Sequence, residues 1–244
     1  MKTFTAVVES IAALDAARAE VVLRCPPDTR LAPGQFLLAH AGGLIPRPIF
    51  PRRSTPTGLT FECDAAAAED WRPGSPLAML GPLGRPARWP DPARNLLLLH
   101  LSPGPLRLLP LAEQILARPG GAVALLFSSP DASLAGLPES LEIRRGSPEA
   151  HLPDTLAWAD VACLDAPPAA LPGLRRTLQE TLGRVRPFVG PSSVGGLPVL
   201  ALLAPPLPCG VGACGVCAVS TRRGWRNACT DGPLFEISDL RFQI

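Results

Sequence analysis

The chain has 244 residues, of which 47% are hydrophobic and 18% charged, and its formal net charge at pH 7 is +2. This composition supplies enough apolar side chains for buried cores and excludes an intrinsically disordered chain. The near-neutral charge, without a basic run carrying interleaved aromatic residues, argues against a nucleic-acid partner. The 31 prolines and 22 glycines predict short elements joined by many turns.

The N-terminal residues do not have the pattern of a signal peptide, because Glu9 and Asp15 interrupt the sequence before an apolar region can form. The longest apolar run, residues 197–208, is too short and too rich in proline to span a bilayer. We therefore expect a cytoplasmic protein without a membrane span. Thiols stay reduced in the cytoplasm, where clustered cysteines bind metal more often than they form disulfides.

The first third of the chain contains short segments rich in Val, Leu and Phe, with Pro–Gly pairs between several of them. The segments are residues 6–10, 19–25, 35–40, 59–63 and 76–80. Strands of this length and spacing predict a small antiparallel β-barrel over residues 1–92.

The pattern then changes to alternating strands and helices. The predicted strands are residues 95–101, 121–129, 140–145 and 159–165, and the predicted helices are residues 106–118 and 171–185. Continuous apolar runs such as 95–101 are typical of strands buried on both faces. We therefore predict a parallel α/β domain over residues 93–205, followed by a small C-terminal segment, 206–244.

Four cysteines gather in the C-terminal segment with the spacing C-x4-C-x2-C-x11-C. They are Cys209, Cys214, Cys217 and Cys229. The first three fit the loop of a plant-type [2Fe–2S] centre, and the fourth ligand returns from a later turn. Glycines between them allow positive φ and bring backbone N–H groups close to anionic sulfurs. We expect the small apolar residues Val211, Ala213 and Val216 to limit the access of water.

Two other interpretations of the cluster are a zinc site and a disulfide pair. Zinc ribbons favour two C-x2-C pairs, whereas this segment has one and has no histidine nearby. A disulfide framework requires an oxidising compartment. The remaining cysteines, Cys25, Cys63 and Cys163, lie in apolar strands and are interpreted as small buried hydrophobic residues.

The three histidines carry no catalytic pattern. His40 and His100 close apolar strands, His151 lies in a Pro-rich stretch predicted as a loop, and none has a Cys, Ser or Asp partner at a useful spacing.

The order of barrel, α/β domain and C-terminal CGVGACGVC segment resembles the electron-transfer subunit of dihydroorotate dehydrogenase, in the ferredoxin–NADP reductase superfamily. Two further stretches match its flavin barrel, PGQF at 33–36 and LGPLG at 80–84. The resemblance implies a ferredoxin-reductase-like fold and a path from NADH through FAD and the [2Fe–2S] cluster to a separate catalytic flavoprotein subunit in a hetero-oligomer. It also implies flavin contacts at Gly81 and Gly84.

The flavin-binding pattern of that family is only half present. Its R-P-x-S stretch appears here as Arg47, Pro48 and Ile49 followed by Phe50 in place of serine. The segment 64–74 lacks the Gly-Thr turn that would hold the pyrophosphate, and it adds acidic residues. Arg47 is therefore either a flavin contact or a surface arginine, and we predict substoichiometric or absent FAD.

The nicotinamide-binding pattern is weaker still. Only Gly104 remains of a glycine-rich turn, and prolines flank it, removing backbone donors. Gly104 is either a dinucleotide contact or a simple turn. The family's cysteine beside the nicotinamide corresponds to Asp165, whose charge is unfavourable there. We predict that NAD(H) binds weakly or not at all.

Two functions follow from these observations. The first is an electron-transfer subunit that is not catalytic alone and passes electrons through the [2Fe–2S] cluster to a dihydroorotate dehydrogenase-like flavoprotein, without efficient NADH binding of its own. The second is an active NADH–FAD–[2Fe–2S] reductase subunit in pyrimidine biosynthesis. The segment between the third and fourth cysteines is either a docking rim or a solvated loop; its candidate residues are Arg222, Arg223, Trp225 and Arg226.

Overall fold

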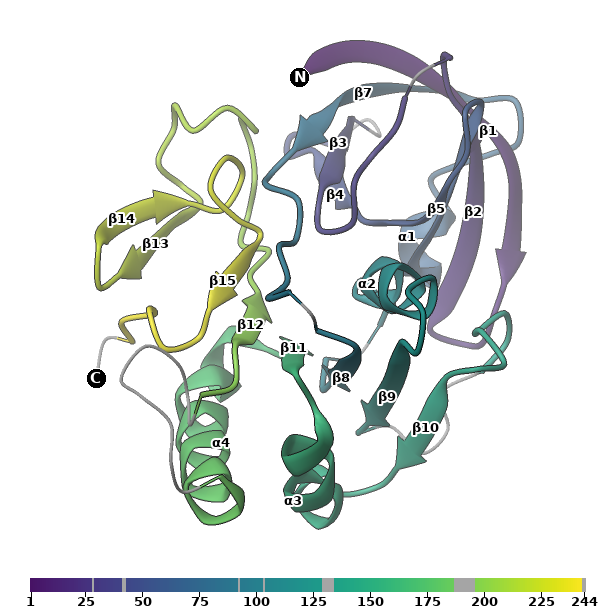
Figure 1. The fold of residues 1–244 in the computed structure, drawn as a ribbon. Coiled ribbons are helices and arrows are strands. Elements are labelled where there is room, and N and C mark those ends of the chain that lie inside the picture. Colours follow the sequence, from purple (N-terminus) through teal and green to yellow (C-terminus); the bar gives the residue numbers. More distant parts are fainter. Residues whose placement is uncertain are drawn as a thin grey trace.

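The computed structural model describes residues 1–27, 29–40, 43–91, 93–102, 104–128, 134–186 and 196–242. Pro103 of the predicted dinucleotide turn and Ser129 of the second predicted buried strand lie outside these residues. Within the described ranges the chain forms a seven-stranded sheet, a six-stranded sheet and a two-stranded hairpin (Figure 1).

The first sheet is antiparallel throughout and forms a nearly closed barrel. Its strands are β1 (Lys2–Ala13), β2 (Arg18–Arg24), β3 (Phe36–His40), β4 (Arg47–Ile49), β5 (Pro51–Ser54), β6 (Gly58–Asp64) and β7 (Pro76–Leu83). The spatial order is β4-β3-β7-β1-β2-β6-β5, and only Phe50 separates the two edge strands along the chain. A short helix, α1 (Ala65–Ala68), follows β6.

Alternation of side chains explains the barrel interior. Along β7, Leu77, Met79 and Leu83 are buried while Pro76 and Ala78 are exposed, which is the period of two expected for a strand with one face in a core. The interior also contains Phe61, against whose ring the Trp71 indole packs edge-on.

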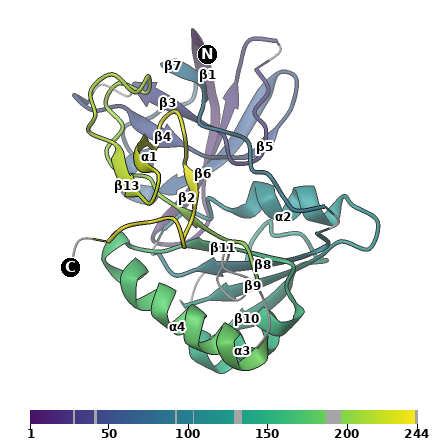
Figure 2. The ribbon, with the colours of Figure 1, turned by 60° about the vertical axis from the view of Figure 1, so that its left-hand side comes forward.

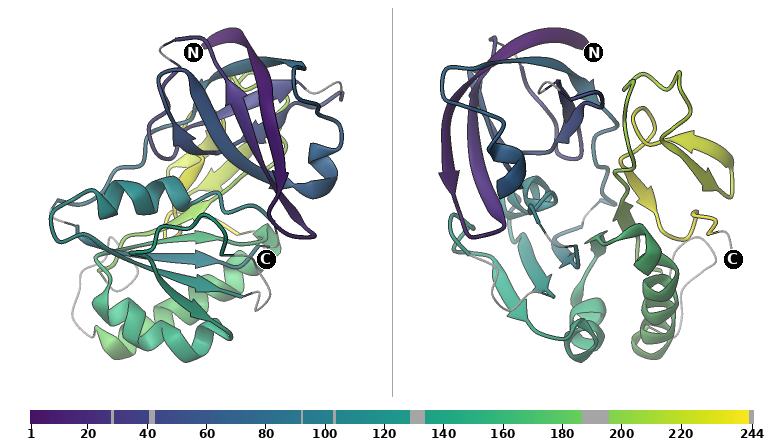
Figure 3. Two further views of the ribbon diagram at one scale, coloured as in Figure 1. Left: turned by 90° about the vertical axis from the view of Figure 1, so that its right-hand side faces the viewer. Right: turned by 180° about the vertical axis from the view of Figure 1, so that it is seen from behind.

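The second sheet is parallel except at one edge. Its strands are β8 (Asn95–His100), β9 (Ala122–Phe127), β10 (Glu142–Arg145), β11 (Val161–Asp165), β12 (Val199–Leu202) and the antiparallel β15 (Leu234–Glu236). The helices are α2 (Leu109–Leu116), α3 (Pro148–Trp158) and α4 (Leu171–Val185), with a 3-10 turn at Pro168–Ala170. Figure 3 shows α2 on the barrel side of the sheet and both α3 and α4 on the opposite face. No helix among the described residues has the length and apolar character needed to cross a bilayer.

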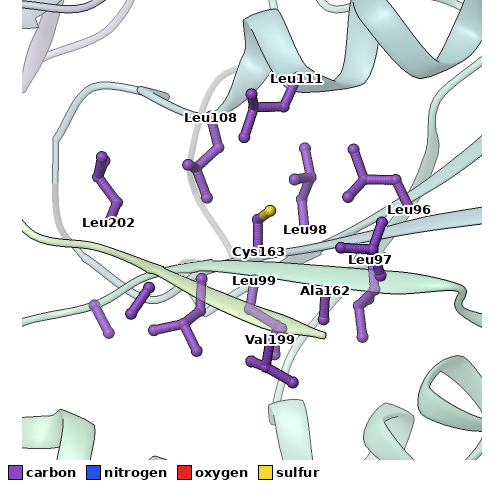
Figure 4. Packing of buried hydrophobic residues seen from close by; sticks show 14 of the residues in the cluster. Leu96, Leu97, Leu98, Leu99, Leu108, Leu111, Ala162, Cys163, Val199 and Leu202 are labelled. Atoms are coloured by element: carbon purple, nitrogen blue, oxygen red, sulfur yellow. The ribbon is translucent and has the colours of Figure 1, made fainter. Parts of the chain in front are cut away.

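The leucine run of β8 is buried on both faces, as its continuous apolar sequence predicts. Leu98 points toward Leu108 and Leu111 beside α2, whereas Leu97 and Leu99 point to the face covered by the other helices (Figure 4). The same core includes Phe36, Phe50 and Leu83 of the barrel region, so the barrel and the α/β sheet pack together.

The α/β sheet has the strand order β10-β9-β8-β11-β12-β15, so the direction of strand progression reverses between β8 and β11. In open α/β sheets, ligands bind beyond the carboxyl ends of the strands at such a point. His100 and Asp165 are the last residues of these two strands and face each other in register.

The fold class predicted from the sequence is confirmed: an antiparallel barrel, an α/β sheet and a small C-terminal segment. One local prediction is wrong. The stretch around His151 is not a Pro-rich loop but helix α3, in which Pro148 occupies the first turn and Pro153 is accommodated within the helix.

Candidate functional site

The cysteine loop lies between β12 and the hairpin formed by β13 (Ala218–Thr221) and β14 (Gly224–Asn227). Figure 2 shows this region beside β3 and β4 of the barrel. Gly210 has a φ of +68°, and a Cβ at this position would lie 2.8 Å from Leu38 Cδ1 and 3.0 Å from Leu80 Cδ2. Only glycine fits this close approach to the barrel.

The four cysteines lie in two pairs. Cys217 and Cys229 are buried, with their sulfurs 3.3 Å apart, and Cys209 contacts the thiol of Cys214. All four are free thiols. Within the described residues, no three metal-ligating side chains converge on a point as a single ion requires. Four thiols in two pairs are the ligand number of a [2Fe–2S] cluster, in which four thiolates bind two irons.

Backbone N–H groups point at the sulfurs. Cys209 accepts from the N–H groups of Cys214, Val211 and Ala213 as well as from the Cys214 thiol, and these contacts lower the pKa of Cys209 to about 6. Burial, followed by the neighbouring Cys217 thiol, raises the pKa of Cys229 to about 12, although the Gly212 N–H also reaches its sulfur. Such donors stabilise anionic sulfur, as the positive φ of the glycines in this loop predicts.

The fourth cysteine is held by the barrel turn that follows β7. Gly84 N–H donates to Cys229 O at 2.9 Å, and Arg85 N–H donates to Gly232 O at 2.6 Å. A Cβ on Gly84, whose φ is +74°, would lie 2.7 Å from Gly232 O. A Cβ on Gly81 would overlap the Leu37 side chain. Both glycines therefore serve packing contacts, and their predicted contact with flavin remains a prediction.

Asn227 fixes the hairpin to the cysteine loop. Its side-chain Nδ2 donates to Gly212 O at 3.2 Å, while its backbone N–H donates to Asp231 Oδ2 at 3.1 Å. Asn227 thus connects the loop, through its side chain, with Asp231, which follows Cys229 by two residues and accepts from the Asn227 backbone N–H.

One face of the cysteine loop is open to solvent. Cys214 is exposed, and the exposed fractions of Val211, Val216 and Trp225 are 43%, 54% and 67%. Val211, Ala213 and Val216 are all exposed, and the expectation that they limit the access of water to a cluster stays a prediction.

A second candidate site is a cavity of about 780 Å³ between the barrel and the α/β sheet. Arg47, Pro48 and Ile49 line it, as the flavin-barrel resemblance predicts. However, the Arg47 guanidinium donates to Asp70 Oδ2 at 2.8 Å and to Ala67 O at 3.0 Å. The arginine expected to face phosphates is thus paired with a carboxylate of its own chain.

The turn after β8 also lies against carboxylates of the barrel. Gly104 has a φ of +100°, and a Cβ there would lie 2.8 Å from Asp64 Oδ1. Leu106 N–H donates to Glu62 Oε2 at 3.1 Å. Glu62 is buried and paired with Arg18 and Arg52, so the turn contacts a carboxylate of the barrel that is already paired.

Asp165 is fully buried at the end of β11. Arg107 Nε and Nη2 donate to its two oxygens at 2.9 and 2.5 Å, and the guanidinium also lies over the Phe50 ring, 5.6 Å from the centroid. His100 Nδ1 is 3.8 Å from Asp165 Oδ2, and burial lowers the pKa of His100. The sequence identified Asp165 but not these partners, because His100 meets it only through the parallel register of β8 and β11, and Arg107 only through the turn after β8.

Solved structures show the same fold at low sequence identity. An NADH-dependent reduced ferredoxin–NADP oxidoreductase, studied for flavin-based electron bifurcation, matches with a TM-score of 0.71 at 18% identity, over 96% of this chain and 89% of that one. The ferredoxin reductase of carbazole 1,9a-dioxygenase, in its FAD apo form, matches with a TM-score of 0.60 at 21% identity, over 74% of this chain and 64% of that one. A cytochrome P450 reductase from Amycolatopsis matches with a TM-score of 0.60 at 17% identity, over 74% and 66%.

Comparison with curated protein sequences gives no match. Residues 207–241 match the family described as the iron–sulfur cluster binding domain of dihydroorotate dehydrogenase B. This range contains all four cysteines of the two pairs. The expected resemblance is therefore confirmed as a similarity: the C-terminal segment is similar to the iron–sulfur cluster binding domain of dihydroorotate dehydrogenase B, and the chain has a ferredoxin-reductase-like fold.

Proposed function

We propose that this chain is an electron-transfer subunit in which Cys209, Cys214, Cys217 and Cys229 hold one [2Fe–2S] cluster. The arrangement of the thiols in two pairs, with backbone donors directed at Cys209, is the observation that carries the proposal. When bound, the cluster supplies one-electron transfer. The chain positions the thiolates, stabilises their charge through N–H groups and leaves one edge, at Cys214, open to solvent.

The electron acceptor is a dihydroorotate dehydrogenase-like flavoprotein, in a hetero-oligomer with this chain and in the reducing environment of the cytoplasm. The name of the matched iron–sulfur family supports this choice of partner. The exposed apolar residues beside Cys214 support a docking face there, and Trp225 and the arginines of the hairpin are also exposed.

The chain does not bind NADH efficiently. The space at the carboxyl ends of β8 and β11 contains the Arg107–Asp165 pair, and the turn after β8 contacts Glu62. Calorimetric titration is expected to give a dissociation constant for NADH above about 1 mM, which corresponds to a binding free energy weaker than about −4 kcal/mol. A micromolar constant would refute this part of the proposal.

The second candidate function is an active NADH–FAD–[2Fe–2S] reductase subunit. The cavity at the switch point of the sheet favours it, as does the fold match with an NADH-dependent ferredoxin–NADP oxidoreductase. The NADH titration separates the two candidates, because only the reductase requires dinucleotide binding.

Analysis of iron, acid-labile sulfide and zinc in anaerobically purified protein tests the cluster itself. The proposal predicts two irons and two sulfides per chain and an electron paramagnetic resonance signal after reduction with dithionite. Zinc in place of iron, or disulfides in iron-free protein, would refute it.

A further inference from the structure

One peptide group of the cysteine loop, between Gly212 and Ala213, makes hydrogen bonds at both of its polar ends. Its carbonyl oxygen, Gly212 O, accepts from Asn227 Nδ2 at 3.2 Å. Its N–H, which belongs to Ala213, donates to the sulfur of Cys209. The side chain of Asn227 and the sulfur of Cys209 are therefore joined through a single peptide group.

Gly212 also lies against the second pair of thiols. Its own N–H reaches the sulfur of Cys229. A Cβ at Gly212, whose φ is +76°, would lie 3.2 Å from Asn227 Nδ2 and 3.3 Å from Thr230 Cγ2. Asn227 thus packs tightly against a residue whose two peptide groups contact a thiol of each pair.

Asn227 is itself held in place by the turn that carries Cys229. It is the last residue of β14, and its backbone O accepts from the N–H groups of Thr230 and Asp231 at 3.1 and 2.8 Å. Its own N–H donates to Asp231 Oδ2 at 3.1 Å. These bonds fix the backbone from which the half-buried amide side chain reaches the cysteine loop.

A donor on a peptide carbonyl strengthens the hydrogen bond made by the N–H of the same peptide, because hydrogen bonds in a chain polarise one another. An N–H directed at a ligand sulfur favours the reduced cluster, which carries one more negative charge, and so raises the reduction potential. The amide of Asn227 can therefore act on the sulfur of Cys209 without touching it.

We propose that Asn227 is a positioning residue for the [2Fe–2S] cluster: through the Gly212–Ala213 peptide it orients and polarises an N–H donor at Cys209, and it thereby raises the reduction potential of the cluster. The inference rests on the function proposed for the four cysteines and adds a residue that sets the driving force of electron transfer. A merely structural tether would affect how much iron the chain retains, but it would leave the potential of the retained cluster unchanged.

Redox titration of the anaerobically purified full-length protein, followed by the electron paramagnetic resonance signal of the reduced cluster, tests the proposal. Asn227→Leu keeps the branched shape of the side chain and removes its donor. At the midpoint potential of the wild-type protein, the ratio of reduced to oxidised cluster should fall at least about threefold, which corresponds to about 28 mV for one electron. Asn227→Ala, a second uncharged variant without the donor, should give a fall of the same size.

Thr221→Val is the matched control in the same hairpin. Thr221 Oγ1 donates to Gly224 O at 2.6 Å, so this variant also removes a side-chain hydrogen bond to a carbonyl, but at the turn between β13 and β14. It should lower the melting temperature and leave the ratio of reduced to oxidised cluster unchanged.

An Asn227→Leu variant with two irons per chain and an unchanged midpoint potential would overturn the proposal, as would a Thr221→Val variant with an equal fall in the ratio. Loss of the cluster from both Asn227 variants would also overturn it, because Asn227 would then serve assembly of the cluster rather than its potential. The iron content of the wild-type protein, measured first, separates these outcomes from a failure of the cluster assignment.

Discussion

The cysteine segment and the cavity between the barrel and the α/β sheet treat negative charge in opposite ways. In the cysteine segment, backbone N–H groups converge on Cys209, and no side-chain carboxylate is among the groups that shift its pKa. In the cavity, the arginines meet carboxylates of the same chain, as in the pairs Arg47–Asp70 and Arg107–Asp165. The first region stabilises anionic ligand atoms, whereas the arginines of the second region are already paired with carboxylates of the same chain.

This difference separates two tasks that the family resemblance assigns to one fold: holding a cluster and binding a dinucleotide. A chain can keep the barrel and the α/β sheet as a scaffold for a cluster while losing the groups that bind a dinucleotide. Here the barrel turn at Gly84 supports Cys229 by a backbone hydrogen bond, so the barrel contributes to the cysteine segment whether or not it holds a flavin.

The largest expected effect is on the cysteine segment. Cys214→Ser or Cys217→Ser should remove nearly all of the iron, because each replaces one of four thiolates that cannot be substituted by another nearby ligand. Cys63→Ser is the control, since Cys63 is a partly buried thiol outside the segment. Iron content per chain is the measurement, and retention of full iron by either cluster variant would show that the ligand assignment is wrong.

The next largest effect concerns the cavity. Asp165→Asn should lower the free energy of unfolding by about 3 kcal/mol, because it leaves Arg107 without its buried carboxylate. Glu9→Gln, which removes a solvent-exposed ion pair, should cost less than about 1 kcal/mol. Urea denaturation followed by circular dichroism measures both values. Equal stabilities of the two variants would mean that the Arg107–Asp165 pair does not stabilise the folded protein.

A smaller effect is expected in the reactivity of the cluster-free thiols. With a pKa of about 6, Cys209 is a thiolate at pH 7.5, whereas Cys25, whose pKa burial raises to about 11, stays protonated. Iodoacetamide should modify Cys209 at least about tenfold faster, and the rate should fall as the pH drops below about 6. Peptide mass spectrometry at several pH values gives the rates. Faster modification of Cys25 would contradict the role of the backbone donors.

Much of the fold could be predicted from sequence because its signals are local. The apolar run 95–101 predicts a strand buried on both faces, and β8 is such a strand. Helix α3 could not be predicted, because its two prolines resemble loop residues. Pro148 lies in the first turn, where a helix tolerates proline, but Pro153 lies inside the helix, where proline is ordinarily unfavourable. The spacing of the four cysteines likewise predicted the segment that contains the two thiol pairs.

The partners in the cavity could not be predicted, because they depend on contacts between distant residues. Asp165 looked unfavourable for a nicotinamide, but its pairing with Arg107 follows from the parallel alignment of β8 and β11 and the path of the turn after β8. The exposure of Val211 and Val216 was also missed, since small apolar residues in a loop give no signal of which face they occupy.

The visible absorption spectrum of the anaerobically purified protein, recorded before and after addition of NADH and then dithionite, tests the central claim most directly. We expect iron–sulfur absorption without a stoichiometric flavin band, no change with NADH, and bleaching with dithionite. A spectrum with one flavin per chain that NADH bleaches would contradict it and would establish the reductase instead.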